Sequence, residues 1–266
     1  AKQAGARVAV INGRLSEHSF RGYRRLRPLI ARMLGWLDLV AVQDATYAGR
    51  FCDLGAPAEL VQVTGSMKYD GAETDRRNAA TLRLRHLAGF GDDDLVFLAG
   101  STQEPEESLC LDAYRAVASQ WPPLRLVLVP RHPDRFDAVA RLLDESGLAW
   151  QRRSRLEQEG ANPAARVLLV DAVGELGAWW ATAQIAYVGG SMGSRGGQNM
   201  IEPAAYGAAI AFGPNTWNFR DIVAAMLGQQ AAVVVHDGNQ LTAFVRRCLA
   251  EPAWAATLGD RAQALV

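Results

Sequence analysis

The sequence has little cysteine, no excess of charge of either sign and no long hydrophobic run. Its three cysteines, Cys52, Cys110 and Cys248, lie far apart without a CxxC pair, which argues against a zinc site or a disulfide scaffold and favours a reducing compartment. The 28 Lys and Arg residues balance the 28 Asp and Glu residues, so we expect no nucleic-acid partner. No stretch reaches about 18 apolar residues, the length that predicts a transmembrane helix.

The signatures of hydrolases and metalloenzymes are also missing. The sequence contains no HExxH or GxSxG motif, no Cys–His pairing and no carboxylate-rich cluster, so it predicts neither a metal site nor a cofactor. Hydrophobic residues nevertheless make up 49% of the chain, enough to fill a core and to exclude a disordered protein.

Short apolar runs recur along the chain, with helical patterns between them. Most runs, such as VFLAG and VLLV, are continuously apolar, which is typical of parallel strands buried on both faces. Segments 104–120 and 133–147 carry apolar residues at three- and four-residue spacing and predict helices. Together these patterns predict a doubly wound α/β fold. The expected strands are 7–12, 37–43, 61–65, 94–100, 125–131, 166–172, 185–191, 208–213 and 231–237.

The polar stretch YDGAETDRRN, residues 69–78, indicates a domain boundary. We expect a partial first α/β domain over 1–72 and a nearly complete second one over 73–266. One continuous sheet is the alternative. The sequence starts at Ala1 in a strand-like run and stops inside a helical pattern at 258–266, so we also expect a piece of a longer protein.

Polar and glycine-rich segments follow the expected strands of the second domain. In open α/β sheets, ligands bind beyond the carboxyl ends of the strands. The segments 100–102, 130–133, 171–176, 189–203 and 213–219 all occupy that position, and we expect them to share one rim.

The most informative segment is GGSMGSRGGQNMIEPAA, which opens a helix after a strand. Its glycines, Gly197 among them, let a ligand approach the backbone, and a helix N-terminus attracts an anion. It is neither a Walker loop nor GxGxxG, so ATP and NAD are not favoured. Glu202 can accept hydrogen bonds from a ribose, with Asn199 beside a phosphate. Alternatively, Asn199 and Glu202 form a helix-capping box.

The segment PRHP places an arginine at the end of an apolar strand. There Arg131 can meet a phosphate with two parallel hydrogen bonds, although an ordinary surface ion pair is the alternative. His132 is equally compatible with a ligand contact and with a satisfied loop position. Ser101 and Thr102 either donate to a ligand or cap the following helix. The same choice between a ligand contact and a role at a helix start remains open for Gly174, Glu175 and Leu176.

The first domain contributes Arg14 and Ser16 just after its first strand, followed by an arginine-rich stretch over 21–32. Apolar residues alternate with these arginines, as in an amphipathic helix that lies on anionic lipid. A solvated basic face is the alternative for this stretch.

The series AGSTQEPEE, PRHPDRF, VDAVGELGAWW, YVGGS…GGQNMIEPAA and GPNTWNF resembles the 3-deoxy-D-manno-octulosonic acid (Kdo) transferases of lipopolysaccharide assembly. Upstream, INGRLSEHSFRGY and VTGSMKYD are similar to the corresponding segments of that family. The resemblance runs from about residue 8 to residue 264 and keeps the order of the motifs.

The resemblance implies a GT-B glycosyltransferase with two Rossmann-like domains. It implies inverting, metal-independent transfer of Kdo from CMP-Kdo to a lipid A precursor, at the cytoplasmic face of the bacterial inner membrane and with peripheral membrane contact. Combined with the motifs, it gives an acceptor side with Arg14 and Ser16. The donor-binding candidates are Ser101, Thr102, Arg131, His132, Gly174, Glu175, Leu176, Gly197, Asn199 and Glu202.

The chain departs from the family pattern in ways that bear on activity. The resemblance places the general base on a glutamate upstream of Ala1, so we expect the isolated chain to bind donor without transferring Kdo. Gln198 stands where a histidine is common in the family. The alternative functions are a GT-B transferase that uses a UDP- or GDP-sugar, and a non-catalytic nucleotide-binding module.

Overall fold

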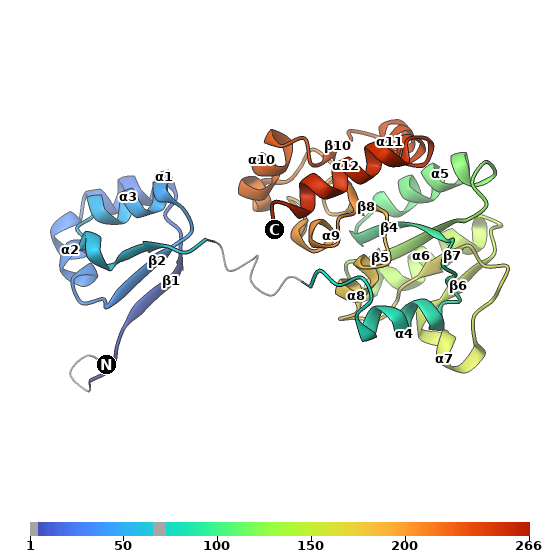
Figure 1. Ribbon diagram of the computed structural model, residues 1–266, viewed down its shortest axis with the longest axis horizontal. Coiled ribbons are helices and arrows are strands. Elements are labelled where there is room, and N and C mark those ends of the chain that lie inside the picture. Colours follow the sequence, from blue (N-terminus) through green and yellow to red (C-terminus); the bar gives the residue numbers. More distant parts are fainter. Residues whose placement is uncertain (1–4, 66–72) are drawn as a thin grey trace. The chain divides into compact units, whose positions relative to one another are not determined.

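The computed structural model describes residues 5–65 and 73–266, and the chain divides into two compact units, 1–71 and 72–266. Each unit has its own parallel sheet, with strand orders β1-β2-β3 and β10-β9-β8-β4-β5-β7-β6 (Figure 1). Every strand pair is parallel, as the continuously apolar runs predicted. Within the described residues no strand joins the two sheets, so the alternative of one continuous sheet is wrong.

Over residues 5–65, the first unit has three short α-helices beside its sheet. The strands are β1 (Ala9–Gly13), β2 (Leu39–Val42) and β3 (Val61–Val63), and the helices are α1 (Glu17–Arg24), α2 (Arg27–Leu34) and α3 (Ala45–Asp53). One hydrophobic cluster of this unit consists of Leu15, Phe20, Leu34, Leu54 and Ala56, and most side chains of β2 are buried as well. Side-chain caps fix two helix starts, because Ser16 accepts from the Ser19 N–H and Asp44 accepts from the Tyr47 N–H.

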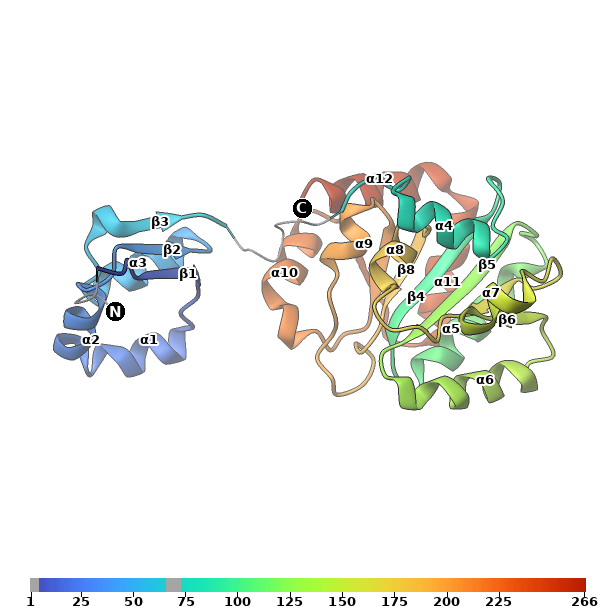
Figure 2. The same ribbon diagram turned by 90° about the horizontal axis from the view of Figure 1, so that it is seen from below.

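The second unit alternates strands and helices along the chain (Figure 2). Its strands are β4 (Leu95–Thr102), β5 (Leu124–Pro130), β6 (Trp150–Arg152), β7 (Val167–Leu169), β8 (Ile185–Val188), β9 (Ala209–Phe212) and β10 (Val233–Val234). Its helices are α4 (Ala79–Leu87), α5 (Glu106–Ala118), α6 (Phe136–Glu145), α7 (Leu156–Glu159), α8 (Leu176–Trp180), α9 (Ile201–Ala205), α10 (Arg220–Gly228), α11 (Gly238–Ala250) and α12 (Pro252–Gln263). The sequence pattern missed β6, a three-residue strand at the edge of the sheet.

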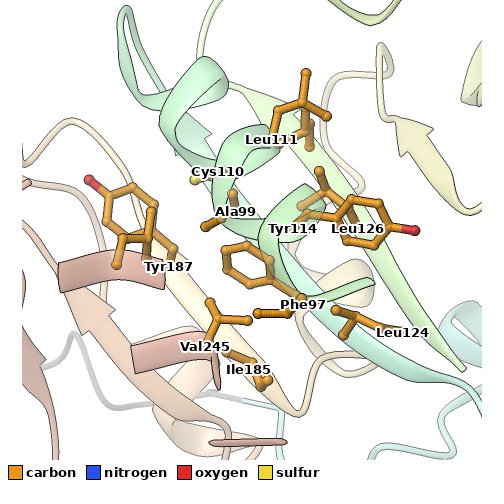
Figure 3. Close-up of a cluster of buried hydrophobic side chains, with 14 of the residues drawn as sticks. Phe97, Ala99, Cys110, Leu111, Tyr114, Leu124, Leu126, Ile185, Tyr187 and Val245 are labelled. Carbon is orange, nitrogen blue, oxygen red and sulfur yellow. The ribbon is translucent and has the colours of Figure 1, made fainter. Parts of the chain in front are cut away.

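Helices cover both faces of the large sheet, with α5 and α11 on one face and α4 and α8 on the other (Figure 1). On the first face, Phe97, Leu126, Ile185 and Tyr187 pack against side chains of α5 and α11 (Figure 3). On the other, a Cβ at Gly100 would lie 2.6 Å from a ring atom of Trp180. Burial on both faces explains why these strands are apolar throughout.

Within 5–65 and 73–266, no helix combines the length and the apolarity needed to cross a membrane.

Candidate functional site

The predicted segments of the second unit follow adjacent parallel strands. The order β9-β8-β4-β5-β7 places the loops after these strands side by side, because the carboxyl ends of parallel strands meet at one edge. This carboxyl edge of the large sheet therefore brings together the loops that carry Ser101, Arg131, Gly174 and Gly197.

The end of β4 carries Ser101 and Thr102 in unusual surroundings. Ser101 adopts a left-handed backbone with φ of 55°, which a residue other than glycine rarely takes. The Thr102 Oγ1 is buried and makes no hydrogen bond with the residues that the structure describes. Helix α5 starts only after Pro105, which makes no side-chain cap, so the alternative that Ser101 or Thr102 caps the helix is wrong.

Arg131 follows β5, and its backbone N–H donates to the Thr102 carbonyl at 3.0 Å. Its guanidinium is exposed and makes no hydrogen bond or ion pair anywhere in 5–65 and 73–266. The alternative of an ordinary surface ion pair is therefore wrong for the described chain. Half-buried His132 precedes a 3-10 turn at Pro133–Arg135.

The loop after β7 is held by arginines from the neighbouring edge strand β6 and from the turn that follows it. Asp171 accepts from Arg152 Nε at 2.6 Å and from Ser154 Oγ at 2.6 Å. The Glu175 carboxylate accepts from Arg153 Nε and Nη2, at 2.8 and 2.6 Å. Both carboxylates thus bind protein groups, which fix the loop that leads to α8.

Gly174 and Leu176 flank that glutamate. Gly174 has a φ of 89°, which favours glycine there. Leu176 is the first residue of α8, and its Cδ1 would lie 3.0 Å from a Cβ at Gly100. This places the start of α8 directly against the last residues of β4.

The glycine-rich loop, residues 189–199, has a backbone conformation that favours glycine at several positions. Gly190, Gly196 and Gly197 have φ of 66°, 89° and 85°. The Gly197 N–H donates to the Gly190 carbonyl at 2.7 Å and closes the loop. A Cβ at Gly196 would lie 2.5 Å from Trp217 Nε1, so the segment after β9 lies tightly against it.

At the end of this loop, Asn199 and Glu202 contact each other. Asn199 Nδ2 donates to Glu202 Oε1 at 2.9 Å, and Asn199 Oδ1 accepts from the Ile201 N–H at 3.1 Å. Met200, not Asn199, occupies the N-cap position of α9, and the Glu202 carboxylate receives a side-chain amide rather than a backbone N–H. The reciprocal capping box is therefore not formed among the described residues, although Asn199 does accept a backbone N–H at the start of α9. Both side chains are half-buried at the rim.

Sequence reasoning missed Glu106, the first residue of α5. Its side chain is 1% exposed, and its carboxylate accepts backbone N–H groups from the glycine-rich loop. One signal was available: Glu106 shares helical spacing with Cys110, Ala113 and Val117, all on the buried face.

In the first unit, Ser16 caps α1 and Arg14 is exposed. Helices α1 and α2 expose large apolar side chains, including Tyr23, Leu26, Leu29 and Met33. Among them Arg21, Arg24 and Arg25 line a hollow of about 420 Å³. We call this basic and apolar area the α1–α2 surface. The segment VTGSMKYD, apart from residues 63–65, lies outside the described residues.

Comparisons with known proteins define the class first. The chain resembles a solved Anabaena HepE in complex with UDP and glucose, with a TM-score of 0.53 and 19% identity, over 99% of this chain and 67% of HepE. It also resembles the crystal structure of the C-terminal CMP-Kdo binding domain of WaaA from Acinetobacter baumannii, with a TM-score of 0.63 and 31% identity, over 69% of this chain and 94% of that domain. The Rossmann-like units have the fold of GT-B glycosyltransferases.

The family follows from the sequence comparisons. The family model of 3-deoxy-D-manno-octulosonic-acid transferase (kdotransferase) matches residues 1–71. A Haemophilus influenzae 3-deoxy-D-manno-octulosonic acid transferase is 34% identical over 85% of this chain and 52% of its own length. The chain belongs to the 3-deoxy-D-manno-octulosonic acid transferase family, and it spans about half the length of the curated relatives it matches.

Proposed function

We propose that the carboxyl edge of the large sheet binds CMP-Kdo as the donor of a glycosyl transfer. The observation that carries this proposal is the match of 69% of this chain to a CMP-Kdo binding domain, at 31% identity over 94% of that domain. The proposed donor residues are Ser101, Thr102, Arg131, His132, Gly174, Glu175, Leu176, Gly197, Asn199 and Glu202.

Arg131 takes the central role in this proposal, because its guanidinium is exposed at the rim and pairs with none of the described residues. The leaving group of a CMP-sugar is CMP, which carries one phosphate, and a planar guanidinium can bind that phosphate through two parallel hydrogen bonds. Charge that develops on the leaving phosphate is then stabilised by a fixed cation at the rim. Glu202, with Asn199 beside it, accepts hydrogen bonds from the ribose hydroxyls.

The proposed acceptor is a lipid A precursor. One of its hydroxyl groups forms the new bond to Kdo, with inversion at the anomeric carbon and without a metal ion. The proposed place of action is the cytoplasmic face of the bacterial inner membrane. Support comes from the α1–α2 surface, whose arginines suit anionic headgroups and whose exposed apolar side chains suit lipid. Arg14 and Ser16 lie just before α1 in the proposed acceptor unit, where Ser16 also caps the helix.

A nucleotide titration tests the proposal. We expect CMP to bind the chain, and UDP and GDP to compete poorly, in isothermal titration calorimetry. Preferential binding of UDP or GDP would favour a transferase with a different sugar nucleotide. No nucleotide binding by the folded chain would refute the donor site.

The acceptor side is tested separately with vesicles. We expect the chain to bind vesicles that contain anionic lipid and not neutral vesicles, and added salt to weaken the binding. Replacing Arg21, Arg24 and Arg25 with glutamine should abolish sedimentation with the vesicles. Unchanged sedimentation of that variant would remove the α1–α2 surface from the proposal.

A further inference from the structure

The carboxylate of Glu106 is buried without a cation beside it. No Lys, Arg or His among the described residues forms an ion pair with it. It accepts instead from three consecutive backbone amides of the glycine-rich loop: Gly190 at 2.7 Å, and Ser191 and Met192 at 2.9 Å each. Converging amides of this kind form an anion-binding nest, and here the anion belongs to the protein itself.

The same carboxylate joins the loop after β4 to the loop after β8. Its Oε2 accepts from the Gln103 N–H at 2.9 Å as well as from Gly190. The two loops are in close contact, since a Cβ at Gly189 would lie 2.6 Å from the Ser101 carbonyl oxygen and 2.8 Å from Glu106 Oε2. The nest therefore depends on glycine at 189 and on an anion at 106.

A third loop is attached through Ser191. Its Oγ accepts from the Gly213 N–H at 2.8 Å, and its carbonyl accepts from the Asn215 N–H at 2.9 Å. Asn215 Nδ2 also donates to the Met192 carbonyl at 3.0 Å. The loop after β9 is thus held by the residues that Glu106 holds.

We propose that Glu106 is a positioning residue, an internal anion that keeps the loops after β4, β8 and β9 in the shape that binds the donor. This inference rests on the proposed donor site, because the loop it fixes carries Gly197 and Asn199. Four backbone amides donate to the two oxygens of this carboxylate, and the Tyr187 hydroxyl donates to Oε1 at 3.0 Å. Replacing the carboxylate with an amide puts an NH2 group in place of one oxygen, so the N–H groups that it faces lose their acceptor and the loop should relax away from its present shape.

Asp94 provides a matched control for a loss of stability. It is also a buried carboxylate of the large sheet, but it lies just before β4, at the amino edge, and pairs with Arg125 Nε at 2.6 Å. Glu106→Gln and Asp94→Asn both replace a buried acid with its amide. Only the first touches the amide nest.

The test measures CMP affinity by calorimetry and amide exchange by mass spectrometry on the whole chain. We expect Glu106→Gln to weaken CMP binding at least tenfold and to speed exchange at residues 190–192. We expect Asp94→Asn to lower the melting temperature but to keep CMP affinity within twofold. CMP affinity within twofold of the unaltered chain for Glu106→Gln would overturn the proposal.

Chemical rescue separates positioning from general damage. In Glu106→Ala the nest is empty, and formate should restore CMP affinity while chloride at the same ionic strength should not. If the variants at 106 do not fold, Gly189→Ala serves instead, since its Cβ pushes the two loops apart, and the same loss of affinity is expected. Full affinity in Gly189→Ala would count against the inference.

Failure of the donor assignment gives a different result. If the unaltered chain binds no CMP, the proposed function is wrong. The role of Glu106 in fixing the loop is then decided by exchange at residues 190–192 alone, where unchanged protection in Glu106→Gln would refute it.

Discussion

At the scale of single residues, the arginines at the rim differ in whether they have a partner. Arg135, Arg152 and Arg153 each form ion pairs with carboxylates. Arg131 stands at the end of β5 with an exposed side chain that pairs with none of the described residues. An arginine that follows a strand and has no protein partner is available to an anionic ligand, as the proposed donor site requires.

Arg131→Ala is expected to weaken CMP binding by about 1.5–3 kcal/mol, the range for hydrogen bonds to a charged group. Arg131→Lys should recover only part of the loss, because a point charge cannot replace a planar fork. Calorimetry measures both, with Arg141→Ala, an exposed arginine of α6, as the control that should bind normally. Equal affinities for Arg131→Ala and the unaltered chain would remove the phosphate role.

Glu202→Gln distinguishes a ligand contact from a structural contact. The variant keeps an oxygen for the Asn199 amide, so the free energy of unfolding should change by less than about 0.5 kcal/mol, as for surface substitutions. CMP affinity should fall, because a charged acceptor of the ribose hydroxyls is lost. Thermal unfolding and calorimetry on the same preparation give both values. A lower melting temperature with full affinity would remove Glu202 from the donor site.

At the scale of elements, the edge strand β6 and the turn after it hold the loop that leads to α8. Arg152 and Ser154 bind Asp171, and Arg153 binds Glu175. Burial alone would raise the pKa of Asp171, but hydrogen bonds from Ser154 and Arg152 outweigh it and hold the pKa below its usual value. The ionised carboxylate therefore stabilises the fold, and this contribution is lost as the pH falls through the lowered pKa.

Asp171→Asn is expected to reduce the free energy of unfolding by about 1–3 kcal/mol at neutral pH. The difference from the unaltered chain should shrink as the pH falls below about 3.9, the pKa of an unperturbed aspartate. Urea denaturation at neutral and acidic pH measures it. Asp137→Asn is the matched control, since Asp137 also binds Arg152 but its side chain is 79% exposed. Equal losses in the two variants would contradict the effect of burial.

Some of the strands and contacts could be predicted from sequence patterns and others could not. Central strands such as β4 and β5 are long apolar runs and could be predicted, as could their parallel pairing. Strand β6 could not, because three residues at a sheet edge carry no periodicity. The rim could be predicted from strand ends, but the partners of Glu175 and Glu106 depend on loops 22 and 84 residues away in sequence. Single-sequence spacing contains no information about such contacts.

At the scale of the whole molecule, the described residues of the two units bury hydrophobic clusters of very different size. The first unit buries side chains around Leu54 and along β2, whereas the second buries many more, around Leu126 on one face of the large sheet and around Trp179 on the other. Because the chain divides into two compact units, and each of these clusters of described residues lies within one unit, the stability of one unit need not depend on the other.

Scanning calorimetry is therefore expected to show two unfolding transitions, and CMP should raise the midpoint temperature of only one of them. A ligand at a free concentration of about 100 times its Kd stabilises the unit that binds it by about 2.7 kcal/mol. Two variants assign the transitions to the units. Leu54→Ala should lower the midpoint temperature of the transition that CMP leaves unchanged, and Leu126→Ala should lower that of the transition that CMP raises. Each variant should reduce the unfolding free energy of its unit by about 2–5 kcal/mol. If CMP raised the transition that Leu54→Ala lowers, the donor would contact the first unit, and a site confined to the carboxyl edge of the large sheet would be wrong.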